Sequence, residues 1–206
     1  MCNVMLLVRK ERIVDDDTRS RLIPVYTEYL RSIRTRGRDR YTLFCSDYSY
    51  KVTTTDFNTF MQTVQIFMNA KNLLLHARAI PETEVTDNGR STIYTNERFA
   101  VAHHGTIPDA EKHNPRITID SELLLDIYRD VDYTDIQNWF IKSLEKYPRS
   151  TTEIVYDREE NAYIIASNFM PLYKYEDNYI KLYSTFKVNN DFIQQDGYKV
   201  FIEKLI

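Results

Sequence analysis

Hydrophobic positions along the chain follow two different periods. In residues 19–35 apolar side chains recur three and four positions apart, which predicts an amphipathic helix. Asp56 is expected to cap a second helix, and further helices are expected over 121–130 and 134–146. Short apolar runs between polar turns predict strands over 3–8, 41–46, 72–77, 92–94, 98–103, 152–157, 162–167 and 179–185.

The mixture of the two periods predicts the fold class. Strands separated by helices fit an α+β fold in which two sheets carry helices on their outer faces. Residues 189–206 predict a short terminal helix or strand, and Asp87-Asn88-Gly89 in the polar stretch 81–91 predicts a turn. We expect a single domain over residues 1–206, because no repeat or low-complexity linker interrupts the sequence.

Composition and charge narrow the class of protein. The formal net charge of −3 gives no basic excess, so nucleic-acid binding is not expected. The arginines between Arg31 and Arg40 are interpreted as a solvated helix end with one motif arginine, and an anion-binding patch is the alternative. No apolar run approaches the ~18 residues of a membrane span, and no signal peptide is recognisable. Two cysteines make no disulfide framework, so a cytoplasmic location is expected.

Cys2 is the first candidate for chemistry. It follows Met1 and precedes an apolar strand, and cysteine is small enough to permit removal of the initiator methionine. Removal would place a thiol beside a free α-amino group, whose pKa is ordinarily near ~8. Such a residue combines a nucleophile with a base. The alternative is a harmless cysteine at position 2, and the position alone does not separate the two.

Five further segments follow Cys2 in a recognisable order. They are Arg36-Gly37-Arg38-Asp39, His76-Ala77-Arg78, His103-His104-Gly105, Asp120-Ser121-Glu122, and Ala166-Ser167-Asn168 with Pro171-Leu172-Tyr173. With Cys2, this series resembles the class II glutamine amidotransferase domain, an N-terminal-nucleophile (Ntn) hydrolase, over nearly the whole chain. The resemblance implies a four-layer αββα sandwich of two mainly antiparallel sheets, with Cys2 at the edge of a core strand.

The resemblance also implies a role for each motif. Cys2 would attack the side-chain amide of L-glutamine and form a thioester, with its α-amine moving the proton. Arg78 would bind the α-carboxylate through a bidentate guanidinium, and Asp120 would bind the α-ammonium. Arg36, with Asp39, would support the substrate site at the Cys2 terminus. The alternatives are a surface arginine for Arg78, an N-cap for Asp120 and a solvated turn for Arg36.

The oxyanion site departs from the family pattern. The family uses an asparagine side chain and the N–H of the next glycine, whereas here His104 precedes Gly105. A neutral imidazole still donates one N–H, but losing an oxyanion donor costs on the order of 100- to 1,000-fold in rate. A metal site at His103-His104 is less supported, because no further ligand cluster has suitable spacing. No metal or cofactor is expected.

Three functions are compatible with these residues. The leading hypothesis is a stand-alone glutaminase module of an amidotransferase, which passes ammonia to a separate synthetase or transferase acting on a sugar phosphate, an acyl-adenylate or a modified purine. The alternative is a glutamine-binding or regulatory subunit of the same fold that has lost turnover through His104. A third hypothesis, another amide hydrolase of this superfold, is disfavoured because Arg78 and Asp120 together would bind a free α-amino acid.

Overall fold

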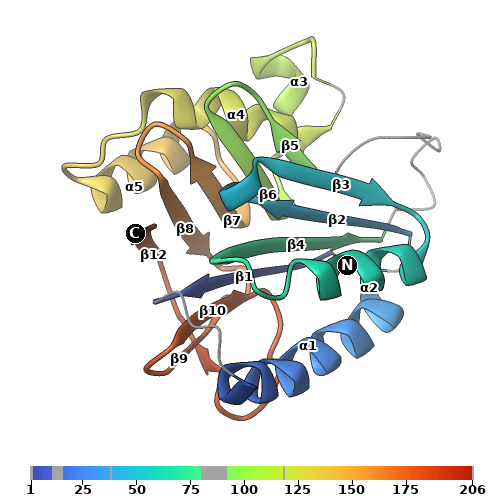
Figure 1. Ribbon diagram of the computed structural model, residues 1–206. Coiled ribbons are helices and arrows are strands. Elements are labelled where there is room, and N and C mark those ends of the chain that lie inside the picture. Colours follow the sequence, from blue (N-terminus) through green and yellow to red (C-terminus); the bar gives the residue numbers. More distant parts are fainter. Residues whose placement is uncertain (1, 11–15, 38, 80–91, 118, 206) are drawn as a thin grey trace. The chain divides into compact units, whose positions relative to one another are not determined.

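The computed structural model describes residues 2–10, 16–37, 39–79, 92–117 and 119–205, with the side chains of 16–19, 21 and 33–36 left out. The turn predicted at Asp87-Asn88-Gly89 lies outside these residues. The chain divides into two compact units. The first comprises residues 1–93 and 173–194, and the second comprises residues 94–172 and 195–206. Each unit contains one sheet (Figure 1).

The first unit is built on a seven-stranded sheet. Its strand order is β11-β9-β10-β1-β4-β2-β3, and its neighbouring strands pair antiparallel. The strands are β1 (Asn3–Arg9), β2 (Arg40–Cys45), β3 (Tyr50–Thr54), β4 (Asn72–Arg78), β9 (Tyr173–Glu176), β10 (Ile180–Ser184) and β11 (Ile193–Gln194). β1 is buried at every position, as its continuous apolar run predicts.

Two helices cover one face of this sheet, α1 (Asp16–Arg36) and α2 (Phe57–Ile66) (Figure 1). Tyr29 of α1 and Phe60 of α2 are fully buried in the same core as the alternate residues Met5 and Leu7 of β1. Burying a large apolar side chain contributes roughly 1.5–3 kcal/mol, so this face stabilises the unit. Asp56 caps α2 as predicted, because its carboxylate accepts the N–H groups of Asn58 and Thr59.

The second unit contains a five-stranded sheet of order β12-β8-β7-β6-β5. Its strands are β5 (Ile93–Thr95), β6 (Phe99–Thr106), β7 (Ser150–Asp157), β8 (Ala162–Asn168) and β12 (Lys199–Lys204). β6, β7, β8 and β12 pair antiparallel in turn. The helices are α3 (Ala110–His113), α4 (Leu123–Ile127) and α5 (Ile136–Lys146).

The helix predicted over 121–130 is interrupted. A 3₁₀ turn over Asp120–Glu122 precedes α4, and a second turn over Tyr128–Asp130 follows it. The apolar face is nevertheless the expected one, since Leu123, Leu124 and Ile127 share a core with the β6 side chains. Two antiparallel sheets with helices confirm the predicted α+β class.

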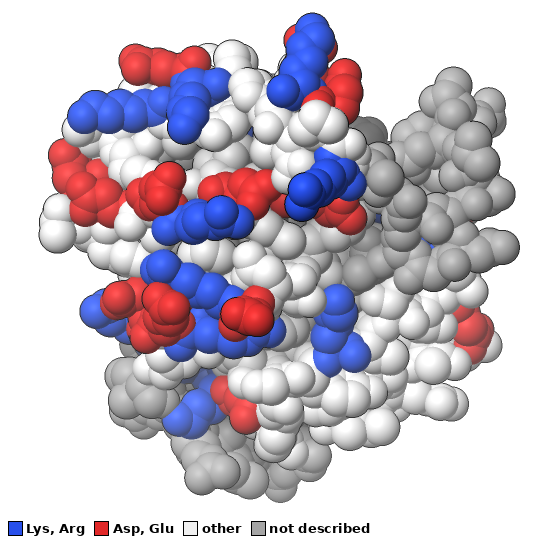
Figure 2. All heavy atoms as spheres, turned by 90° about the horizontal axis from the view of Figure 1, so that it is seen from above, with Lys and Arg blue, Asp and Glu red and all other residues white. Residues whose placement is uncertain are grey.

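Charges on the face shown in Figure 2 are mixed in sign. Among the described residues seen from this side, acidic and basic side chains alternate rather than gather into a patch of one sign. None of the helices in the described part of the chain is long and apolar enough to cross a membrane.

Candidate active site

Cys2 and Arg78 occupy corresponding ends of two neighbouring strands. β1 and β4 pair with Asn3 opposite Ala77, and the register continues through Val4 and His76. Extending this register by one residue puts Cys2 opposite Arg78, at positions that share one face of the sheet. Cys2 and Arg78 are both intermediate between buried and exposed. The register therefore puts Cys2 and Arg78 at the same end of two central strands of this sheet.

The Arg-Gly-x-Asp segment lies against the same end of β4. Gly37 follows the end of α1, and a Cβ added to it would lie only 2.6 Å from the carbonyl oxygen of Ala77. The Asp39 N–H donates a 3.1 Å hydrogen bond to the carbonyl of Arg78. This segment therefore needs glycine for a close backbone approach. Arg36 ends α1, but its side chain lies outside the described part, so its role stays a prediction.

Arg40 is a candidate that the sequence interpretation missed. It pairs with Arg78 across β2 and β4, and it is buried with 4% of its surface exposed. The interpretation of the arginine cluster as solvated is therefore wrong at Arg40, although Arg31 is exposed and pairs with Glu28. No period-two alternation marks Arg40 in the sequence, because all six positions of β2 are buried.

His103 and His104 face opposite sides of β6, because side chains alternate along a strand. Burial, together with the neighbouring His103, lowers the pKa of His104 to about 4. The ring is therefore neutral at pH 7 and carries one N–H donor. Within the part of the chain that the structure describes, no residue forms a hydrogen bond with the His104 ring.

Gly105 has a backbone conformation that requires glycine. Its φ angle of +146° is disfavoured for other residues, and an added Cβ would lie 2.1 Å from the carbonyl oxygen of Ser150. The backbone after His104 is thus held closely against the beginning of β7. The structure keeps His104 and Gly105 adjacent and well supported at the end of β6.

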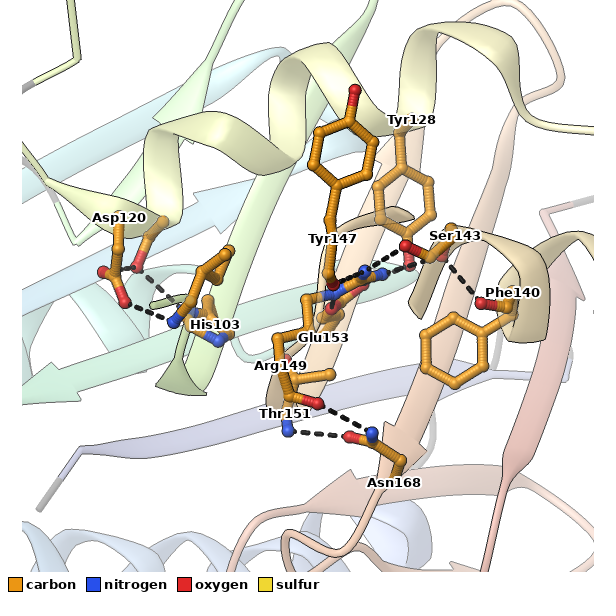
Figure 3. A network of polar contacts seen from close by, with 12 residues as sticks. His103, Asp120, Tyr128, Phe140, Ser143, Tyr147, Arg149, Thr151, Glu153 and Asn168 are labelled. Carbon is orange, nitrogen blue, oxygen red and sulfur yellow. Dashed lines mark hydrogen bonds and ion pairs between the residues drawn. The ribbon is translucent and has the colours of Figure 1, made fainter. Parts of the chain in front are cut away.

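Asp120 joins this end of β6 to the 3₁₀ turn that it begins. Its Oδ2 accepts a 2.9 Å hydrogen bond from the Ile107 N–H, and its Oδ1 accepts a 3.3 Å bond from the Ser121 hydroxyl. The Ser121 oxygen also lies 2.9 Å from Nδ1 of His103 (Figure 3). Asp120 is not an N-cap residue, because the preceding residue, Ile119, is the cap. Its carboxylate is tied to the loop after β6 instead.

A buried ion pair next to His103 was not predicted from the sequence. One of its members, Glu153, lies opposite His103 in the register of β6 and β7. Arg149 and Glu153 have side chains with 0% exposure and bond at 2.5 Å (Figure 3). Tyr128 donates a 2.7 Å hydrogen bond to Glu153, and Arg149 also donates to Ser143. Burial alone would raise the pKa of Glu153, but the charge of Arg149 holds it below its ordinary value. No sequence motif marks this pair, because the residues that bond to it, Tyr128 and Ser143, come from separate elements.

The predicted site residues therefore form two groups. The first unit brings together Cys2, Gly37, Arg78 and Asp39, and adds Arg40. In the second unit, Asp120 is bonded to Ile107 and is linked through Ser121 to His103, whereas the side chain of His104, which precedes Gly105, points to the other side of β6. No group of three or more His, Cys, Asp or Glu side chains that could hold a metal ion occurs among the described residues.

Solved structures share the fold of this chain. It matches "the allosteric regulatory enzyme of purine biosynthesis" with a TM-score of 0.66 and 15% identity, over 98% of this chain and 46% of that one. It matches glutamine phosphoribosylpyrophosphate amidotransferase from B. subtilis, complexed with ADP and GMP, with a TM-score of 0.63 and 16% identity, over 98% and 47%. A predicted glutamine amidotransferase from Pseudomonas aeruginosa matches with a TM-score of 0.50 and 11% identity, over 98% and 92%.

At 15% and 16% sequence identity, the likeness to the first two structures shows the fold of this chain and not its activity. The chain spans about half the length of the first two structures. No protein-family model matches the sequence, and no curated protein sequence matches it. The Ntn-hydrolase fold expected from the resemblance to class II glutamine amidotransferases is confirmed by the structural likeness over nearly the whole chain.

Proposed function

We propose that this chain is a glutaminase of the glutamine amidotransferase type, with Cys2 as its nucleophile. The observation that carries the proposal is the register of β1 and β4. Extended by one residue, this register puts Cys2 opposite Arg78. The α-carboxylate and the side-chain amide of glutamine are separated by a short aliphatic chain. The long side chain of Arg78 can therefore bind the carboxylate while the amide lies at the thiol.

Before the reaction, hydrolysis of the Met1–Cys2 peptide bond removes Met1 and frees the α-amine of Cys2. This amine takes the thiol proton, and the thiolate forms a bond to the amide carbon of glutamine. The carbon–nitrogen bond then breaks, and ammonia leaves with the proton that the amine returns. Water hydrolyses the thioester, which releases glutamate and restores the thiol.

Three further residues have the remaining roles in this proposal. His104, through its ring N–H, and Gly105, through its backbone N–H, stabilise the oxyanion that develops on the amide oxygen. Asp120 binds the α-ammonium of glutamine. The hydrogen bonds from Ile107 and Ser121 support this role, because they fix the carboxylate in one orientation while leaving it further acceptor capacity.

We further propose that the ammonia passes to a separate synthetase or transferase in the cytoplasm. The class of acceptor is a sugar phosphate, an acyl-adenylate or a modified purine. This part of the proposal rests on the resemblance to class II glutamine amidotransferases, and the matched region makes up 46% and 47% of the chains of two structural neighbours.

His104 favours a second candidate function. A histidine in place of the family asparagine fits a glutamine-binding or regulatory subunit in which turnover has been lost. In that case Arg78 and Asp120 bind glutamine, while the oxyanion is left without a well-placed side-chain donor.

Glutamine hydrolysis by wild type, Cys2→Ala and Cys45→Ala tests the proposal, with intact mass determined for each protein. We expect wild type and Cys45→Ala to lack Met1 and to release glutamate and ammonia, and Cys2→Ala to release neither. Wild type that binds glutamine without hydrolysing it, and that retains Met1, would support the second candidate. Hydrolysis by Cys2→Ala at the wild-type rate would refute the proposal that the Cys2 thiol is the nucleophile.

A further inference from the structure

We propose that His103 is a positioning residue that acts through the Ser121 hydroxyl to orient the Asp120 carboxylate. This inference rests on the proposed function, in which Asp120 binds the α-ammonium of glutamine. Three atoms form the connection: His103 Nδ1 lies 2.9 Å from Ser121 Oγ, which lies 3.3 Å from Asp120 Oδ1 (Figure 3).

The direction of each hydrogen bond follows from counting hydrogens. Ser121 has one hydroxyl hydrogen, and an ionised carboxylate can only accept. The hydroxyl therefore donates to Asp120, and its oxygen accepts from His103. This requires a hydrogen on Nδ1 of His103. With the opposite tautomer, Ser121 would donate to the imidazole and turn its lone pairs toward the carboxylate of Asp120.

The other ring nitrogen of His103 bears on this assignment. Nε2 is buried, and no described residue forms a hydrogen bond with it. The opposite tautomer would bury an N–H donor there without a partner, at the full cost of its desolvation, whereas the assigned tautomer gives both the Nδ1 hydrogen and the Ser121 hydrogen an acceptor. Burial lowers the pKa of His103 against the opposing charges of Asp120 and Glu153, which keeps the ring neutral with a single hydrogen.

The buried ion pair completes the arrangement. Glu153 lies opposite His103 in the register of β6 and β7, and an unpaired carboxylate there would attract a second proton to the imidazole. Arg149 compensates the charge of Glu153, and Tyr128 donates to the same carboxylate. The network thus stabilises the neutral ring that the Ser121 contact requires.

The tautomer can be measured without any assay of activity. Two-bond ¹H–¹⁵N correlation spectra of the histidine rings, assigned with His103→Leu, report which nitrogen carries the hydrogen. We expect a protonated Nδ1 and a bare Nε2 for His103 at pH 7. A bare Nδ1 would overturn the inference, whatever the chain catalyses.

Kinetics test the consequence for glutamine. His103→Leu and Ser121→Ala should each raise KM for glutamine about tenfold, with kcat changed less than about threefold, because they loosen a charged hydrogen bond. Ser121→Thr keeps a hydroxyl and should restore the wild-type KM. The double variant should be no worse than the worse single variant, since both changes break one connection.

The outcomes separate this inference from the proposed function. If Asp120→Asn raises KM but His103→Leu and Ser121→Ala leave it unchanged, the positioning role is refuted and the function stands. If glutamine is neither bound nor hydrolysed by wild type, the function fails first. If His103→Leu does not fold, Ser121→Ala and Ser121→Thr carry the comparison, because Ser121 is only partly buried.

Discussion

The backbone N–H of Ile107 donates a 2.9 Å hydrogen bond to Oδ2 of Asp120. This bond joins the segment that follows His104 and Gly105 to the first residue of the next 3₁₀ turn. The strand that carries His104 and Gly105 is therefore tied to Asp120 through the backbone of the second unit. In the first unit, Gly37 packs closely against Ala77 and the Asp39 N–H donates to the carbonyl of Arg78, so both support the end of β4.

Arg78 is expected to bind the α-carboxylate of glutamine. Arg78→Ala should weaken glutamine binding by roughly 2–5 kcal/mol, because a desolvated charge loses its partner. Arg78→Lys should recover little of this loss, since an ammonium cannot form the bidentate contact. Calorimetry on the Cys2→Ala background measures the binding. Arg31→Ala is the matched control, because that arginine is exposed and contacts Glu28. Affinities within twofold of the parent in both Arg78 variants would exclude the role.

His104 is expected to donate to the oxyanion. His104→Ala should lower the rate of glutamine hydrolysis by about two orders of magnitude, and His104→Asn should keep or raise it. Steady-state rates of the three proteins decide. Equal rates in wild type and His104→Ala would remove this side chain from the mechanism and leave the Gly105 N–H as donor. An inactive wild type that His104→Asn revives would support the regulatory candidate.

His104 should also make stability depend on pH. Its pKa is about 4 in the folded chain, whereas an unfolded histidine titrates near ~6.5, so the unfolded state binds the proton more readily. Stability is therefore lost as the pH falls from about 6.5 to 4, by about 3 kcal/mol in total. Urea unfolding of wild type and His104→Asn at pH 7 and pH 4 tests this. The difference between the two proteins should change with pH, and a constant difference would contradict the assignment.

Arg149 and Glu153 are expected to behave as a buried pair. Arg149→Met should destabilise the chain by about 3–5 kcal/mol, because Glu153 loses its opposite charge in the core and keeps only the hydrogen bond from Tyr128. Arg149→Met combined with Glu153→Leu should recover most of that loss. Chemical unfolding of the two single variants and the double variant gives the coupling energy. Additive losses would show that the two side chains act independently.

The central strands of the first sheet and the beginning of α2 were predicted from the sequence. β1 and β4 are continuous apolar strands, and Asp56 caps α2 as expected. The strands that were missed, β3, β9 and β11, have few buried positions and so give no period-two signal. Single-domain organisation over residues 1–206 stays a prediction beside the two compact units.

The candidate site rests on motifs, and the roles of Cys2, Arg78, His104 and Asp120 stay predictions. The contacts of these residues could not be predicted from the motifs. The carboxylate of Asp120 was open to interpretation as a cap, because its partner Ile107 is thirteen residues away and only the fold brings them together. Arg40 and Arg149 were beyond such reasoning, since charged side chains are buried only where the tertiary structure provides for them.

Labelling with a diazo-ketone analogue of glutamine tests the central claim most directly. We expect one adduct per chain, located on Cys2 by peptide mass spectrometry and prevented by excess glutamine. Cys45 should stay unlabelled, because it is buried and its pKa is raised to about 11 by burial and the nearby Asp47. The adduct should be absent in Cys2→Ala. Labelling that persists in Cys2→Ala, or that falls on Cys45, would contradict the assignment of Cys2 as the nucleophile.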